Sequence, residues 1–351
     1  MGIRTTCIGA YPKPDYINIA DWSESASAAG ENPEARGFTY VSGEPESVSD
    51  SLLDRATLEA VSDQVASGVD IPTDGEQRRE NYIHYHCRHM TGIDFGLLTT
   101  KLHRNGAAIA DLPTITGRIE STGAHFLDRD YRVAQSCTDK PVKITVPGPV
   151  TIIDTTANTF YENDRELAFD LAAALNVEIR ALAAAGCRHI QVDEPLLVRN
   201  LDYALDFGVE CLERCFDGVP ADVQKIMHMC CGYPGHLDDH DYLKADPGIY
   251  SLLAKALDES CIDQVSIEDA HRHNDLELLE RFPSSIIILG SVAIATSRVE
   301  PVEEIAERLS AALKHIDRDR LVAAPDCGLT MLDRDLAMQK LKNLCEAASS
   351  V

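Results

Sequence analysis

The chain has 351 residues, 44% of them apolar, and its 57 acidic against 32 basic residues give a net charge of −25. This apolar fraction supports a large core and excludes wholesale disorder. So acidic a chain should repel nucleic acid and anionic membranes, and no apolar run approaches the roughly 20 residues of a membrane span. The first residues also lack the hydrophobic stretch of a signal peptide. We expect a cytoplasmic protein with one domain, residues 1–351, and leave open whether it forms a homo-oligomer.

Short β-branched runs alternate with longer helical patterns, which is typical of parallel strands joined by crossover helices. Strands are predicted, in chain order, at residues 5–10, 69–74, 142–147, 189–194, 223–229, 265–268, 286–291 and 321–325. Helices are predicted at 164–185, 246–259 and 301–316. Eight strands in this alternation predict an α/β fold, a single (β/α)8 TIM barrel. A doubly wound sheet is the alternative, but no glycine-rich dinucleotide loop follows the first strand.

Two segments fall outside this alternation. Residues 23–49 are rich in Gly, Glu and Ser and are predicted to form a long loop over the barrel mouth after the first strand. Residues 112–119 resemble a strand but lie too close to the next one for a helix-bearing crossover. We therefore predict that they form a hairpin arm within an excursion over residues 112–145.

Polar residues follow most of the predicted strands, and catalytic groups of a barrel gather at the carboxyl ends of its strands. The polar residues at these ends are Asp74, Glu76, Asp193, Glu194, His228, Cys230, Glu268, Asp269, Asp326 and Cys327. A buried strand that ends in a charge or a thiol leaves a polar group that needs a partner. Their convergence on one rim predicts a functional site there.

His228 and Cys230 are two residues apart on a strand, so both side chains point to the same side. Imidazole and thiolate together suit zinc, and barrel closure would bring Cys327 and Glu268 beside them. A set of two cysteines and one histidine with an exchangeable fourth ligand is typical of catalytic zinc. The alternative is that His228 and Cys230 are ordinary core residues. Cys231 points to the other side of the strand and is predicted to be in the core.

Several segments carry a family resemblance. They are His228-x-Cys230, Pro325-Asp326-Cys327-Gly328-Leu329, Thr5-Thr6-x-Ile8-Gly9, Asp74-Gly75-Glu76, Pro147-Gly148-Pro149-Val150-Thr151 and Ile190-Gln191-Val192-Asp193-Glu194-Pro195. In order, over residues 3–345, they resemble the C-terminal catalytic domain of cobalamin-independent methionine synthase. That family belongs to the zinc-dependent thiol alkyltransferases, which include epoxyalkane:coenzyme M transferase.

The resemblance implies a TIM barrel of the uroporphyrinogen decarboxylase and methionine synthase type. It implies Zn²⁺ bound by His228, Cys230, Glu268 and Cys327, with Glu268 as the ligand that leaves. The partners would be a small thiol and a small alkyl donor. Zinc would bind the thiol as a thiolate, because coordination deprotonates a thiol whose free pKa is about 8.5.

Departures from the family pattern bear on the alkyl donor. The resemblance places Ala10 where the family has Ser, and Thr155 near the position of the aromatic residue that stacks on folate. Ala293 and Ala295 stand where the family has Asp and the proposed histidine acid. A pterin needs a flat platform and a proton at its leaving nitrogen, so folate is not expected as the donor.

Two acceptor thiols remain open. We favour coenzyme M opening an epoxide, with Arg78 binding the sulfonate and Arg79, His84, His86 and Arg118 as further cations. The alternative is homocysteine methylation to methionine. The resemblance supports this alternative through Asp193 and Glu76, which match the family's homocysteine-binding residues.

Further residues are expected to contact the substrate or to donate a proton. Ile8 and Ala10 are expected to contact the thiol substrate, and Asp193 to take part in catalysis. Tyr11 is the first choice for the acid that protonates an epoxide oxygen, and His84 or His86 is the second. A silent zinc-binding paralogue and a decarboxylase of related fold stay open.

Overall fold

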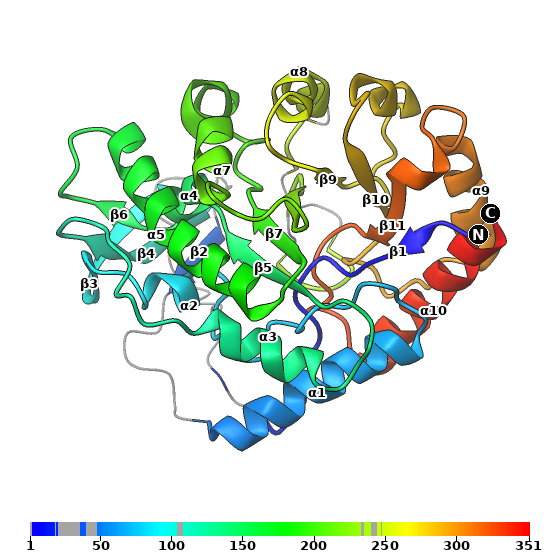
Figure 1. Ribbon diagram of the computed structural model, residues 1–351, viewed down its shortest axis with the longest axis horizontal. Coiled ribbons are helices and arrows are strands. Elements are labelled where there is room, and N and C mark those ends of the chain that lie inside the picture. The colour runs from blue at the N-terminus through cyan, green and yellow to red at the C-terminus, as the bar shows by residue number, and fades with distance from the viewer. Residues whose placement is uncertain are drawn as a thin grey trace.

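The computed structural model describes residues 2–17, 19, 36–39, 48–103, 108–232, 235–239, 244–246 and 248–351. In this part of the chain, seven strands form one curled sheet in the order β1-β11-β10-β9-β8-β7-β5, and every neighbouring pair is parallel (Figure 1). The strands are β1 (Arg4–Thr5), β5 (Lys143–Pro147), β7 (His189–Asp193), β8 (Gln224–Met229), β9 (Gln264–Ile267), β10 (Ile286–Val292) and β11 (Leu321–Pro325). Seven of the eight predicted strands are therefore present, although β1 ends at Thr5, the first residue of the strand predicted at 5–10.

The remaining predicted strand, residues 69–74, does not form a continuous ladder. It makes single parallel bridges, from Ile71 to Thr6 on one side and from Thr73 to Lys143 on the other. The segment therefore lies between the two edge strands β1 and β5. Pro72 interrupts the ladder because it has no N–H to donate, although its carbonyl still accepts a hydrogen bond from the Lys143 N–H at 2.8 Å.

Helices cover the outer face of the sheet (Figure 1). The longer ones are α1 (Asp50–Ala66), α3 (Leu127–Gln135), α5 (Asp164–Ala185), α7 (Val209–Cys215), α8 (Gly248–Asp258), α9 (Val302–Ala312) and α10 (Arg334–Ser350). Shorter helical turns are α2 (His84–Cys87), α4 (Pro149–Asp154), α6 (Leu201–Tyr203), η1 (Ala204–Gly208), η2 (Leu276–Arg281) and η3 (Arg318–Arg320). The three predicted helices are present as α5, α8 and α9.

The bounds of α5 follow from its capping residues. The Asn163 side chain accepts a hydrogen bond from the Glu166 N–H at 2.9 Å, which satisfies a free donor of the first turn. At the other end Gly186 adopts φ 106°, a left-handed conformation that favours glycine.

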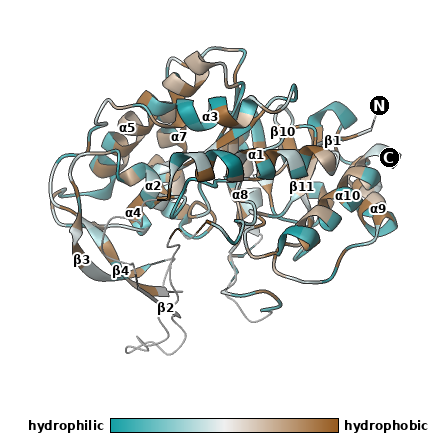
Figure 2. Ribbon diagram, turned by 90° about the horizontal axis from the view of Figure 1, so that it is seen from below, coloured by the Kyte–Doolittle hydropathy of each residue, from teal (hydrophilic) through white to brown (hydrophobic). Residues whose placement is uncertain are grey.

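A smaller sheet lies at one end of the molecule (Figure 2). In it β3 (Ile93–His103) runs antiparallel to β4 (Ala108–Ile115), and β2 (Arg36–Thr39) and β6 (Ala157–Asn158) pair with β4 in parallel. The predicted excursion at 112–145 was therefore placed too late, because the paired strands lie at residues 93–103 and 108–115 and residues 127–135 form α3. Much of β3 is exposed on both faces, so it lacks the apolar alternation that would have revealed it. The predicted mouth loop at 23–49 lies outside the described residues except for 36–39 and 48–49.

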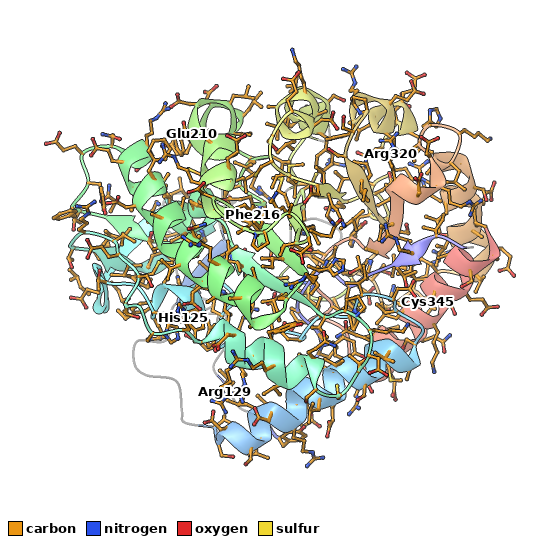
Figure 3. The ribbon with its side chains drawn as sticks, in the orientation of Figure 1. His125, Arg129, Glu210, Phe216, Arg320 and Cys345 are labelled. Carbon is orange, nitrogen blue, oxygen red and sulfur yellow. The ribbon has the colours of Figure 1, made fainter. Side chains whose placement is uncertain are left out.

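Two apolar clusters form the core. The larger fills the space between the sheet and the helices, and the smaller lies on the inner face of the sheet, where it comprises Ile8, Ile226, Ile288, Val322 and Ala324. Cys345 of α10 shows the outer packing, since its Sγ lies 3.8 Å from Thr5 Oγ1 of β1 (Figure 3). No helix in the described ranges is long and apolar enough to cross a membrane.

Candidate functional site

Three of the predicted metal ligands meet at the carboxyl ends of the strands. His228 lies on β8, Cys230 directly follows β8, and Cys327 follows β11. Their ligand atoms all lie within 4.8 Å of one another, and we call these residues the donor triad. Strands β9 and β10 separate β8 from β11 in the sheet, so its curvature brings the three side chains together.

The imidazole of His228 is oriented for a metal. Its Nδ1 lies 2.9 Å from the hydroxyl of Ser266, its register partner on β9. Its Nε2 is buried and has no hydrogen-bond partner among the described residues. A buried nitrogen without a partner is costly, and donation from Nδ1 to Ser266 leaves the Nε2 lone pair free for coordination. With two thiols beside it, the donor triad fits zinc.

The two thiols of the donor triad differ in acidity. The adjacent Cys327 thiol and then the His228 imidazole lower the pKa of Cys230 well below its ordinary value. The same contact raises the pKa of Cys327, because it cannot ionise easily beside a thiolate. Cys230 is therefore the first of the two to become a soft, negatively charged ligand.

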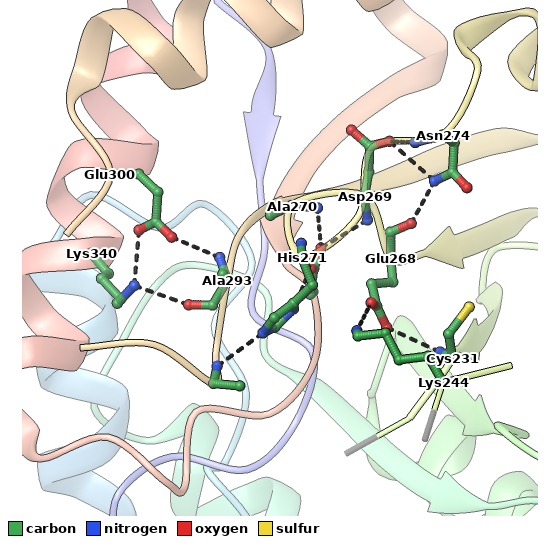
Figure 4. A network of polar contacts seen from close by, with 12 residues as sticks. Cys231, Lys244, Glu268, Asp269, Ala270, His271, Asn274, Ala293, Glu300 and Lys340 are labelled. Atoms are coloured by element: carbon green, nitrogen blue, oxygen red, sulfur yellow. Dashed lines mark hydrogen bonds and ion pairs between the residues drawn. The ribbon is translucent and has the colours of Figure 1, made fainter. Parts of the chain in front are cut away.

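Glu268, the predicted fourth ligand, lies beside the donor triad but outside it. Its carboxylate forms an ion pair with Lys244 and accepts a hydrogen bond from the Cys231 N–H at 3.1 Å (Figure 4). A carboxylate oxygen of Glu268 and ligand atoms of His271 and Asp326 lie within 4.8 Å of one another. Glu268 therefore has a cation as its partner in this structure.

The predicted substrate residues share the rim with the donor triad. Asp193 ends β7 directly opposite His228 in the strand register, and burial raises its pKa to about 7. The Ala10 carbonyl accepts the Leu329 N–H at 2.7 Å, which holds the end of the first strand against the segment that carries Cys327.

Glu76 lies at the same rim and is tightly enclosed. Its Oε1 accepts a hydrogen bond from the Thr145 hydroxyl at 2.7 Å. A Cβ at Gly9 would lie 2.5 Å from the same oxygen, so a side chain there would displace the Glu76 carboxylate. The backbone after Ile8 therefore packs directly on this carboxylate.

Comparison with known proteins places this site in a family. Residues 3–350 match the family described as cobalamin-independent synthase, catalytic domain. The chain belongs to this family. The methionine synthase of Saccharolobus islandicus (strain Y.G.57.14) is 30% identical over 353 residues, which cover 99% of this chain and 95% of that protein. The methionine synthase of Sulfurisphaera tokodaii is 27% identical, over 99% of this chain and 92% of that protein.

Solved structures agree with this placement. A B12-independent methionine synthase from Shewanella sp. W3-18-1, in complex with selenomethionine, has a TM-score of 0.82 and 28% identity and covers 99% of this chain and 97% of its own. A protein from Listeria monocytogenes, at 19% identity and a TM-score of 0.68, shows the fold alone. The resemblance stated from the sequence motifs is thus confirmed.

Arg78 does not face the rim that carries the donor triad. Its guanidinium forms ion pairs with Asp50 and Asp54 of α1, and so faces the helix layer. The neighbouring Arg79 is the cation at the rim, where it donates to the Thr145 hydroxyl at 2.8 Å and lies 3.5 Å from Glu76. The positive φ of Glu76, 56°, turns the chain just before these two arginines.

The predicted acids Tyr11 and His84 are likewise held by hydrogen bonds to other groups. The Tyr11 hydroxyl donates to Asp63 of α1 at 3.4 Å, so it is no longer a candidate acid for the rim. His84 Nε2 lies 3.1 Å from the Thr155 carbonyl, and burial lowers its pKa to about 4. Burial also lowers the pKa of His86 well below its ordinary value. Both imidazoles are therefore neutral at pH 7, contrary to the expectation of a protonated donor.

One histidine that was not predicted from the sequence, His271, lies beside Ala295. His271 Nδ1 lies 2.6 Å from Asp326, and its Nε2 accepts the N–H of Ala295 at 3.0 Å (Figure 4). A pocket of about 290 Å³ lies here, lined in part by His271, Ala293 and Ala295. The position of His271 three residues after Glu268 was the one sequence signal that could have pointed to it.

Proposed function

We propose that this protein is a zinc-dependent S-methyltransferase that converts homocysteine to methionine. The donor triad, with its free His228 Nε2, is the observation that carries the proposal. The names of the relatives support homocysteine as the acceptor, which was the alternative interpretation of the sequence. Nothing in the described residues favours the epoxide interpretation, and Arg78, chosen there for the sulfonate, is bound to α1.

His228, Cys230 and Cys327 would hold the zinc, with Glu268 as the exchangeable fourth ligand. Bound there, zinc supplies the acidity that turns a substrate thiol into a nucleophilic thiolate near neutral pH. Lys244 neutralises the Glu268 carboxylate whenever Glu268 is not a ligand.

Asp193 and Glu76 would bind the amino-acid end of homocysteine. Asp193 lies opposite His228 in register, so an ammonium group on its carboxylate places the rest of the substrate beside the donor triad. Two carboxylates at the rim favour a substrate that carries a positive charge.

The methyl donor is proposed to be a compound other than a methylfolate, and a methylcorrinoid is the donor to test. Thr155 is buried at the end of α4 and offers no aromatic face. Ala293 and Ala295 offer no side-chain proton, and the His271 Nε2 already accepts the Ala295 N–H. A pterin-binding site would need both a flat platform for the ring and an acid that protonates its leaving nitrogen.

We further propose that residues 69–74 complete a closed (β/α)8 barrel as its eighth strand. The parallel bridges to β1 and β5 on its two sides support this closure. Closure would put Asp74 and Glu76 on the same rim as the donor triad.

The test combines metal content with product formation. We expect one zinc per chain, a new zinc–sulfur bond in X-ray absorption when homocysteine is added, and methionine by mass spectrometry from a methylcorrinoid but not from methyltetrahydrofolate. The double variant Cys230→Ser, Cys327→Ser should lose zinc and activity.

Cys231→Ser is the matched control for this test. Its thiol donates to the Tyr250 hydroxyl at 3.3 Å on the other side of the strand, so this variant should keep its zinc. Full zinc occupancy in the double variant would refute the metal site. A zinc-loaded native protein that did not bind homocysteine would refute the substrate.

A further inference from the structure

A chain of buried polar groups runs along the inner face of β5 and β7. Lys143 Nζ donates to Gln191 Oε1 at 2.6 Å. Gln191 Nε2 in turn donates to the Ile8 carbonyl at 2.8 Å and to Asp193 Oδ1 at 2.7 Å. All four residues are buried, and Lys143 and Gln191 have no exposed surface.

The partners of Gln191 allow only one orientation of its amide. An ammonium group can only donate and a backbone carbonyl can only accept, so Oε1 must face Lys143 and Nε2 must face Ile8. Both amide hydrogens are then used, one on Ile8 and one on Asp193. Gln191 therefore fixes the spacing between the Ile8 carbonyl and the Asp193 carboxylate.

Lys143 is a costly residue for a purely structural role. No carboxylate of the described residues forms an ion pair with it, and a buried charge without a counterion is unfavourable. Burial lowers its pKa to about 8, while the nearby Asp193 opposes that shift. Its positive charge therefore acts on Asp193 through one intervening amide.

We propose that Gln191 and Lys143 are positioning residues for the α-ammonium group of the substrate thiol. This inference rests on the proposed function, in which the thiol is homocysteine. Gln191 occupies Oδ1 of Asp193, which leaves Oδ2 and the second lone pair of the Ile8 carbonyl to accept from one ammonium group. Lys143 holds the amide in the orientation that makes this pair of acceptors. The arrangement selects amino-acid thiols over thiols that lack the amine.

The test compares two thiols that differ only in that amine, homocysteine and 4-sulfanylbutanoate, by titration into the zinc-loaded protein. Gln191→Glu is the sharpest variant, because it keeps the contact with Lys143 but places an acceptor oxygen against Ile8 and Asp193. We expect the preference for homocysteine to fall about tenfold or more. Zinc content should not change, and the affinity for 4-sulfanylbutanoate should change less than about threefold.

Lys143→Met provides a second variant that keeps the amide but frees its orientation. It should lower the same preference and raise KM for homocysteine with kcat nearly unchanged. Gln264→Glu is the matched control, because Gln264 is a buried glutamine on β9 that donates to Gln224 at 2.9 Å. Its preference should equal that of the native protein.

Two results would overturn the inference and are distinguishable from failure of the proposed function. If Gln191→Glu and Lys143→Met weakened both thiols equally, or left the preference unchanged, the pair would have a structural role only. If the native protein itself bound both thiols equally well, homocysteine would not be the substrate, and the proposed function would fail together with the inference.

Discussion

Two fully buried lysines, Lys143 on β5 and Lys340 on α10, have opposite surroundings. Lys340 Nζ donates to the Glu300 carboxylate at 2.9 Å and to the carbonyl of Ala293 (Figure 4). It also donates to the carbonyl of Arg298. Lys143 donates to the neutral amide of Gln191. The two lysines are equally buried, but the charge of Lys340 is neutralised by a carboxylate and the charge of Lys143 is not.

The difference separates a structural contact of Lys340 from the positioning role proposed for Lys143. Glu300 also accepts the Ala293 N–H at 3.0 Å, so the Lys340–Glu300 pair fixes the loop after β10. Lys143 fixes no loop, and its charge acts toward Asp193 at the rim. The comparison teaches that the partner of a buried charge, rather than its burial, indicates what the charge is for.

Lys340→Met should give the largest effect on stability. It leaves the Glu300 carboxylate buried without its cation, which typically costs about 3–5 kcal/mol. Lys143→Met leaves only the Gln191 carbonyl oxygen unpaired, for about 1–3 kcal/mol. Urea unfolding of both variants measures the two losses, and adding Glu300→Leu to Lys340→Met should recover part of the larger one. Equal losses in the two single variants would contradict the comparison.

The pH dependence of stability should also distinguish Lys143. Burial lowers its pKa from 10.5 to about 8, so between these values the unfolded chain holds a proton that the folded chain has lost. The free energy of unfolding contributed by Lys143 therefore rises as pH increases from about 8 to 10.5. Native protein should gain on the order of 1–3 kcal/mol relative to Lys143→Met across this window. Parallel unfolding curves of the two proteins at pH 8 and pH 10 would rule the effect out.

The donor triad was predictable because its signals are local. His228 and Cys230 are two residues apart at the end of one strand, and Cys327 lies two residues after another, so alternation and strand ends were enough to predict their meeting. Glu268 was predicted equally well as a strand end. Its pairing with Lys244 was not, because Lys244 comes from another loop.

The polar chain behind Asp193 could not be predicted in this way. Lys143 and Gln191 lie inside runs that were interpreted only as strands, and they meet because β5 and β7 are neighbours in the sheet. Arg78 and Arg79 are adjacent in sequence, yet one faces α1 and the other Glu76. The chain turns just before them at Glu76, whose φ is positive, and composition does not encode that turn.

Lys244 combines features of both lysines and gives the smallest predicted effect. Like Lys340 it pairs with a buried carboxylate, but that carboxylate is Glu268, the proposed exchangeable zinc ligand. An ion pair and a metal bond compete for the same oxygens, so Lys244 should weaken zinc coordination by Glu268 and help an incoming thiol to displace it.

Lys244→Met should therefore bind zinc about tenfold more tightly and homocysteine about tenfold more weakly. Competition with a fluorescent chelator measures the first change, and thiol titration the second. Lys255→Met is the control, because Lys255 pairs with Glu259 on an exposed helix face, where such pairs contribute little. If zinc affinity stayed the same or fell in Lys244→Met, the Lys244–Glu268 pair would be a brace like Lys340–Glu300, because only a competing pair can strengthen metal binding when it is removed.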